Sequence, residues 1–138
     1  MATKFYVATT LSNADQAIVA INRLQEFGHE LTYDWTKHGY LHDKADKKDA
    51  ASKELKGVAD ADLLLVIWPG GGGTHVEIGY ALAMQKTIIF VAPNNLEREV
   101  SFYQHENVLR IEEMNKAIEV AHKYLSEIER SLDVGGNR

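Results

Sequence analysis

Residues 62–83 read DLLLVIWPGGGGTHVEIGYALA, and this stretch decides the fold. It begins with a predicted strand, Asp62 to Trp68, that is continuously apolar from Leu63 onward, as expected of a strand that is buried on both faces of a sheet. Pro69 and four glycines follow, and the pattern from Thr74 to Gln85 predicts a helix. A buried strand that leads through a glycine-rich turn into a helix is typical of a parallel α/β unit.

On both sides of this stretch, short apolar runs alternate with amphipathic segments. The alternation predicts one α/β domain with a doubly wound, flavodoxin- or Rossmann-like sheet of five parallel strands, in the order 2-1-3-4-5, with helices on both faces. We expect the domain to span residues 1–131, with a flexible tail at 132–138. The other expected strands are Lys4–Thr10, His29–Asp34, Thr87–Ala92 and Asn107–Ile111, and the other helices are Asp15–Phe27 (ended by Gly28), Lys44–Ala59 and Glu112–Ser131.

The composition excludes several classes of function. The chain has 138 residues and no cysteine, which rules out a disulfide framework, a thiolate nucleophile and a cysteine-based zinc site. A net charge of −5 without a basic stripe argues against a nucleic acid polymer as partner. The N-terminal MATKFYVATTL does not resemble a secretory signal, and no apolar run is long enough to cross a membrane. We therefore expect a cytoplasmic protein with a small-molecule ligand.

In a doubly wound sheet, ligands bind beyond the carboxyl ends of the strands, where the strand order reverses. Here that place lies between the loops after strands 1 and 3, Thr9–Asn13 and Pro69–Gly73. Glycines let the backbone approach a ligand closely, and the following helix N-terminus offers unpaired amides to an anion. The candidate substrate-binding residues in these two loops are Thr9, Thr10, Gly71, Gly72, Gly73 and Thr74.

Glu77 is the candidate catalytic carboxylate, and two interpretations of it are open. Thr74 and Glu77 fit a T-x-x-E capping box, in which the glutamate only closes the helix N-terminus. Alternatively, Glu77 lies in the first helical turn at the mouth of the glycine loop, where the helix dipole favours its ionised form. An ionised carboxylate there is suited to attack an anomeric carbon.

The sequence Glu77-Ile-Gly-Tyr-Ala-Leu-Ala, followed by Lys86 and TIIFVAP, resembles the nucleoside 2-deoxyribosyltransferase family, including its 2′-deoxynucleoside 5′-monophosphate hydrolases. The similarity covers nearly the whole chain. It implies cleavage of an N-glycosidic bond, with transfer of the sugar to water or to another base. It also implies that Glu77 is the nucleophile and that Tyr6 orients it.

The same resemblance implies a second carboxylate and a shared site. The family has an Asp-Leu pair where this chain has Glu54-Leu55, and Asp49 is the alternative to Glu54. Ser101 matches a serine that a neighbouring subunit lends to the phosphate, so we expect a homodimer or a higher homo-oligomer. Phe102 and Tyr103 follow in an expected loop, where exposed aromatic side chains favour a subunit contact. The alternative is that both rings fold back onto the closing helix.

A second resemblance competes with the first. Residues 69–77, PGGGGTHVE, are similar to the PGGxGTxxE motif of the lysine decarboxylase-like phosphoribohydrolases, which release cytokinin bases from nucleotides. A non-catalytic nucleotide sensor on the same fold is a third possibility, because fold does not fix function.

The segment from Trp35 to Lys48 is either a lid or a solvated connection. Trp35 is a candidate for stacking on a base, with packing as the alternative. His38, His42 and Asp43 lie in this one expected loop, and we do not interpret them as metal ligands. The proposed chemistry needs only protein groups, so we expect no metal and no cofactor.

Overall fold

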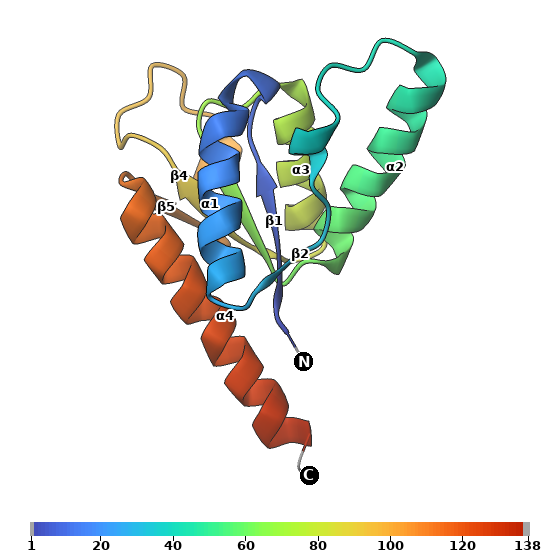
Figure 1. The fold of residues 1–138 in the computed structure, drawn as a ribbon. Helices are drawn as coiled ribbons and strands as arrows, with labels where there is room; N and C mark the ends of the chain where they lie inside the picture. Colours follow the sequence, from blue (N-terminus) through green and yellow to red (C-terminus); the bar gives the residue numbers. More distant parts are fainter. Residues whose placement is uncertain (1, 137–138) are drawn as a thin grey trace.

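The computed structural model describes residues 2–136 and contains one five-stranded sheet (Figure 1). All pairings are parallel and the order is β2-β1-β3-β4-β5, so the predicted fold class is confirmed. The strands are β1 (Lys4–Ala8), β2 (Glu30–Leu31), β3 (Leu63–Ile67), β4 (Thr87–Val91) and β5 (Val108–Ile111).

Helices cover both faces of the sheet (Figure 1). On one face lie α1 (Ala14–Glu26) and α4 (Met114–Gly136), and on the other lie α2 (Lys44–Asp60) and α3 (Gly72–Ala83). Burial on both faces explains why β3, at the centre of the sheet, is apolar and buried at every position. Three short 3-10 helices complete the chain: η1 (Leu11–Asn13), η2 (Trp35–Lys37) and η3 (Ser101–Gln104).

The predicted end of α1 is confirmed. Gly28 has a φ of +94°, a left-handed conformation that glycine adopts without steric cost. Its N–H donates to the Gln25 carbonyl, and the N–H of His29 donates to the Leu24 carbonyl. This is a Schellman motif, which turns the chain from α1 into β2.

Several predicted boundaries were wrong by one or more residues. The first strand, expected to reach Thr10, ends at Ala8, and three further differences bear on the site or on the tail. The second strand was expected at His29–Asp34 but stops at Leu31, where Thr32 makes a last bond to β1 and Asp34 then caps η2. Helix α3 begins at Gly72, two residues earlier than expected, because the glycines themselves enter the helix. Helix α4 continues past Ser131 to Gly136, so residues 132–136 of the expected tail are helical, and 137–138 lie outside the described residues.

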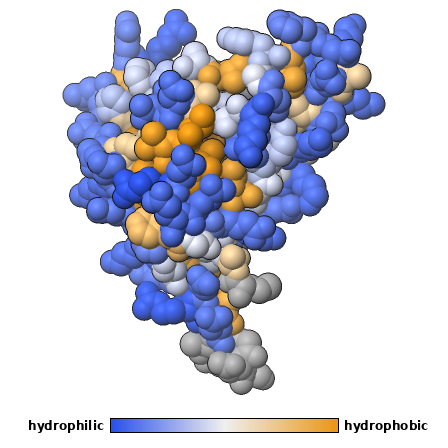
Figure 2. All heavy atoms as spheres, in the orientation of Figure 1, coloured by the Kyte–Doolittle hydropathy of each residue, from blue (hydrophilic) through white to orange (hydrophobic). Residues whose placement is uncertain are grey.

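The surface is largely hydrophilic in the view of Figure 2, with a hydrophobic patch near the centre of this face, over α1. Ile18 and Val19 of α1 are exposed large hydrophobic residues. Within residues 2–136, no helix is long and apolar enough to span a membrane.

Candidate active site

A cavity of about 430 Å³ lies where the loops after β1 and β3 meet. Both loops were expected to border the site, and both line this cavity. A third wall comes from the segment that follows β2, and a fourth from α2. The sequence-predicted residues that line the cavity are Thr9, Thr10, Trp35, Glu54, Gly71, Gly73, Thr74 and Glu77.

The Glu77 carboxyl is buried at the base of this cavity and is hydrogen-bonded to a residue of the central sheet. Only 8% of Glu77 is exposed, and its Oε2 accepts a hydrogen bond from the Tyr6 hydroxyl. Tyr6 lies on β1 and is fully buried. The expected pairing of Tyr6 with Glu77 is therefore present, and it connects residues 71 positions apart in the chain.

Burial sets the protonation of this pair. It raises the pKa of Glu77 to about 8, although the Tyr6 hydrogen bond favours the ionised form, and the nearby Glu54 raises the pKa further. Burial, followed by the charge of Glu77, raises the pKa of Tyr6 well above its ordinary value. The phenol therefore stays protonated and donates a hydrogen bond to Glu77. We expected the helix dipole to keep Glu77 ionised, but removal of the carboxyl from water outweighs that effect.

The capping-box interpretation of Glu77 was wrong. The N-cap of α3 is Gly71, and Thr74 is the third residue of the helix, so Glu77 lies in its second turn. The Thr74 hydroxyl accepts a hydrogen bond from the Gly71 N–H at 3.1 Å, which closes the helix end without a carboxylate. Glu77 is therefore free of a capping role.

The glycine loop leaves space beside its backbone. A Cβ added at Gly72 or Gly73 would meet no atom within 4 Å, whereas one at Gly70 would come within 3.0 Å of the Thr74 side chain. Gly73 lines the cavity, and Gly72, which was also expected to bind substrate, does not.

The structure separates the two candidates for the second carboxylate. Glu54 lines the cavity, and burial raises its pKa, while the nearby His38 lowers it. Asp49 does not line the cavity and forms an exposed ion pair with Lys53 at 2.9 Å. Gly57 brings α2 close to the sheet, because a Cβ there would lie 3.0 Å from the Tyr6 ring. Helix α2 thereby holds Glu54 near Glu77.

The segment after β2 forms one side of the cavity. Trp35 is buried and lines the cavity, and its ring N–H donates to the Val7 carbonyl at 2.7 Å, which fixes the ring against β1. His38, Tyr40 and Leu41 also line the cavity, and Tyr40 is 76% exposed. This segment is therefore part of the cavity wall and not only a solvated connection.

Sequence reasoning missed Lys47, which lines the cavity from α2. The signal was available, because Lys47 and Glu54 are seven residues apart and so lie on one face of a helix. A cation in this wall complements the two carboxylates and any anionic part of a ligand.

Ser101 does not line the cavity of its own chain. It begins η3, where it is exposed, and Phe102 beside it is 61% exposed. Tyr103 was expected to be exposed as well, and this was wrong. Its ring is buried against Phe90, with 4.5 Å between the ring centroids, because the 3-10 turn points successive side chains in different directions.

The family model described as nucleoside 2-deoxyribosyltransferase matches residues 5–126. The chain belongs to the nucleoside 2-deoxyribosyltransferase family. This family contains enzymes of glycosyl transfer and nucleotide N-glycoside cleavage. A comparison with curated protein sequences found no match.

Two solved structures share the fold. One is the CMP N-glycosidase BcmB of Clostridium botulinum, with a TM-score of 0.63 and 19% identity over 86% of this chain and 98% of that chain. The other is a conserved protein of Enterococcus faecalis V583, with a TM-score of 0.57 and 18% identity over 95% of this chain and 99% of that chain. At these identities the two structures show that the chain shares their fold, and they do not show its substrate.

Proposed function

We propose that this protein cleaves the N-glycosidic bond of a 2′-deoxynucleoside, a nucleoside or its 5′-monophosphate, with Glu77 as the nucleophile. The main support is the buried Glu77 carboxyl, hydrogen-bonded to Tyr6, in a cavity that Glu54 and the glycine loop also line. Burying a carboxyl costs free energy, so a buried carboxyl that does not stabilise the fold is expected to have a functional role. The capping bond of Thr74 leaves Glu77 no such role at the helix end.

In the first step, the Glu77 carboxylate attacks C1′ of the sugar and forms an ester, while the bond from C1′ to the base breaks. The electron pair of that bond leaves with the base, which takes the proton of the Glu54 carboxyl. Burial raises the pKa of both carboxyls, that of Glu77 to about 8, so Glu77 must lose its proton before it attacks, and the Tyr6 hydrogen bond stabilises that ionised form. The reactive form of the pair therefore holds one proton, on Glu54.

In the second step, an acceptor attacks C1′ and releases Glu77 as a carboxylate. If the acceptor is water, Glu54 takes its proton, and the product is the free sugar or sugar phosphate. If the acceptor is a second base, its ring nitrogen attacks C1′, Glu54 takes the proton of that nitrogen, and the product is a new nucleoside. Neither step needs a cofactor or a metal ion.

The decisive experiment incubates the protein with deoxynucleosides, ribonucleosides and their 5′-monophosphates and measures released base by chromatography. CMP and dCMP are the first substrates to test, because the structural neighbour is named as a CMP N-glycosidase. We expect base release from at least one member of the panel. Thermal stabilisation without release from any member would instead indicate a nucleotide sensor.

Replacing Gly73 with Ala tests whether the glycine loop reads the 5′-phosphate. The added methyl meets no protein atom within 4 Å, so we expect the fold to be retained or stabilised by about 0.5–1 kcal/mol. The methyl would fill ligand space, so the thermal protection given by a nucleoside monophosphate should fall, while that given by the free nucleoside changes less. Equal protection of the wild type by nucleoside and monophosphate would argue against a phosphate-reading loop.

Replacing Glu54 with Gln tests the proton donor. We expect a loss of about 10²- to 10⁴-fold for substrates whose base leaves poorly, and a much smaller loss for an activated leaving group. Asp49→Asn is the matched control, because Asp49 lies on the same helix outside the cavity. Equal losses of rate for both substrate types would indicate that Glu54 has a structural role. A selective loss of rate in the Asp49 variant would indicate that Asp49 is the proton donor.

We also propose a homo-oligomer in which Ser101 completes the site of a neighbouring subunit. Ser101 and Phe102 are exposed, and beside them lies an apolar groove of about 580 Å³. The groove is lined by α3 residues, including Ile78 and Leu82, so it lies on the helix that carries Glu77. Light scattering should give a mass well above the 15.5 kDa of one chain.

A complementation test follows from this assembly. In a hybrid of Glu77→Gln and Ser101→Ala subunits, one site combines an intact Glu77 with an intact Ser101. Random assembly of co-expressed inactive variants into dimers should restore about a quarter of the wild-type activity. A monomeric mass would contradict the assembly, and an oligomer without restored activity would contradict only the shared site.

A further inference from the structure

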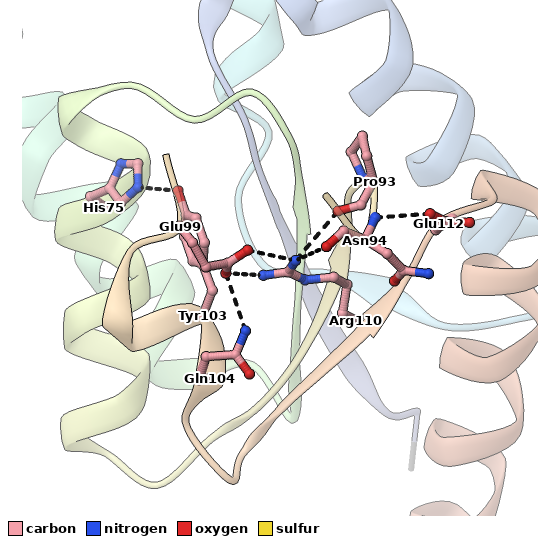
Figure 3. Close-up of polar contacts among 8 residues, drawn as sticks. All are labelled: His75, Pro93, Asn94, Glu99, Tyr103, Gln104, Arg110 and Glu112. Atoms are coloured by element: carbon pink, nitrogen blue, oxygen red, sulfur yellow. Dashed lines mark hydrogen bonds and ion pairs between the residues drawn. The ribbon is translucent and has the colours of Figure 1, made fainter. Parts of the chain in front are cut away.

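His75 joins the glycine loop to a segment on the other side of α3. Its Nδ1 lies 2.8 Å from the carbonyl oxygen of Gly71. Its Nε2 lies 2.7 Å from the hydroxyl oxygen of Tyr103, as Figure 3 shows. A carbonyl can only accept, so Nδ1 carries the hydrogen and donates to Gly71. In the neutral ring Nε2 is then an acceptor, and the Tyr103 hydroxyl donates to it.

Tyr103 is a rigid anchor for this contact. Its ring is buried and packs on Phe90 of β4. The Arg110 guanidinium, from β5, lies 5.8 Å from the centroid of the Tyr103 ring and 5.4 Å from that of Phe90. The Tyr103 hydroxyl that bonds to His75 is therefore held by β4 and by the edge strand β5.

Arg110 also fastens the segment that carries Tyr103. It forms a two-bond ion pair with Glu99 and donates to the carbonyls of Pro93 and Asn94 (Figure 3). Gln104 donates to the same Glu99 carboxylate at 3.2 Å. The chain from β4 through η3 is thereby fixed against β5, although it has little regular structure.

The glycine loop needs such an anchor. Consecutive glycines have more backbone freedom than other residues, and a site that binds through backbone amides requires that freedom to be removed. Gly71 is held at both of its polar groups, since its N–H donates to Thr74 and its carbonyl accepts from the His75 side chain and backbone. His75 does not line the cavity, so it does not touch the proposed substrate.

We infer that His75 is a positioning residue, which holds the Gly71 carbonyl and so fixes the backbone of Gly71 and Gly73, the two loop glycines that line the cavity, for the 5′-phosphate end of the substrate. Through Tyr103 it couples the glycine loop to η3, the short helix that also carries Ser101. The substrate part of this inference rests on the proposed function, whereas the fixing of the loop does not.

Three variants separate the two hydrogen bonds. His75→Leu removes both, His75→Asn places an amide nitrogen where Nδ1 lies and keeps the bond to Gly71, and Tyr103→Phe removes only the hydroxyl. His105→Leu is the control, because it removes an imidazole from the same apolar groove, together with the hydrogen bond that the Asn107 N–H donates to it, without touching Gly71.

The first measurement uses the protein without substrate. Backbone order parameters from ¹⁵N relaxation should be about 0.85 for Gly71 to Gly73 in the wild type, the His75→Asn variant and the control, and should fall below about 0.6 in His75→Leu. Unchanged values in a folded His75→Leu variant overturn the inference. If that variant does not fold, Tyr103→Phe decides, and unchanged values there overturn the link to η3.

The second measurement is kinetic. In His75→Leu the KM of a nucleoside monophosphate should rise about five- to tenfold, the effect of one hydrogen bond, with kcat changed less than about twofold and the KM of the free nucleoside unchanged. His75→Asn should restore the KM. A purely structural role would lower the active fraction and leave KM unchanged. If the wild type releases no base, the proposed function fails, and the order parameters still decide whether His75 fixes the loop.

Discussion

Glu77→Gln is expected to fold and to lower the rate of base release at least about 10³-fold. Glutamine retains the size of the side chain and an oxygen that accepts the Tyr6 hydrogen bond, but its amide cannot form the ester with C1′. The measurement is single-turnover release of base from the best substrate of the panel. The matched control is Glu119→Gln, an exposed carboxylate of α4, whose loss should leave the rate unchanged.

The alternatives to a nucleophile give different results for this variant. If Glu77 only supported the fold, the glutamine variant would keep its turnover, because it fills the same space. Retained turnover would therefore remove Glu77 from the mechanism. Loss of ligand-induced thermal stabilisation together with turnover would show that the variant no longer binds, so binding is measured in parallel.

Glu77→Gln should also remove the loss of stability that the wild type shows as the pH rises. The pKa of Glu77 is about 8 in the folded protein, against an ordinary value of 4.5, so the folded state binds this proton more tightly than the unfolded chain does. The stability that this proton supplies is fully present below about pH 4.5 and is lost as the pH rises through 8. The difference between these two pKa values corresponds to at most about 5 kcal/mol of stability.

Urea unfolding of both proteins at pH 5, 7 and 9 measures this effect. Relative to Glu77→Gln, the wild type should lose stability steadily as the pH rises, because ionisation leaves a charge buried beside Tyr6. The Glu119→Gln control should follow the wild type. A difference between wild type and Glu77→Gln that is constant with pH would mean that Glu77 titrates near its ordinary pKa, as an exposed carboxyl does.

The fold was predictable because its signals are local. The apolar run that became β3, the Gly28 helix end and the alternation of short strands with helices each depend on a few neighbouring residues. The topology follows from the right-handed connections of parallel strands. The edge strand β2 was predicted too long, because an edge strand pairs on one side only and its end is set by that partner.

The sequence also determined which loops border the site and which glutamate lies beside the glycines. The positions after β1 and β3 line the cavity because the carboxyl ends of parallel strands meet at one edge of a sheet. The choice between Glu54 and Asp49 was not available from the sequence. Both lie on α2, and only the rotation of that helix against β1, with Gly57 in contact with Tyr6, turns Glu54 toward the cavity.

Only the tertiary structure determines the protonation of Glu77 and the contacts that hold the glycine loop. The helix-dipole argument favoured an ionised Glu77, but desolvation depends on every element packed around the carboxyl, and those elements come from distant parts of the chain. The buried Tyr103, and its bond to His75, likewise depend on strands β4 and β5. Local pattern fixes which elements form, whereas burial, pKa and the contacts of single side chains arise only when those elements pack together.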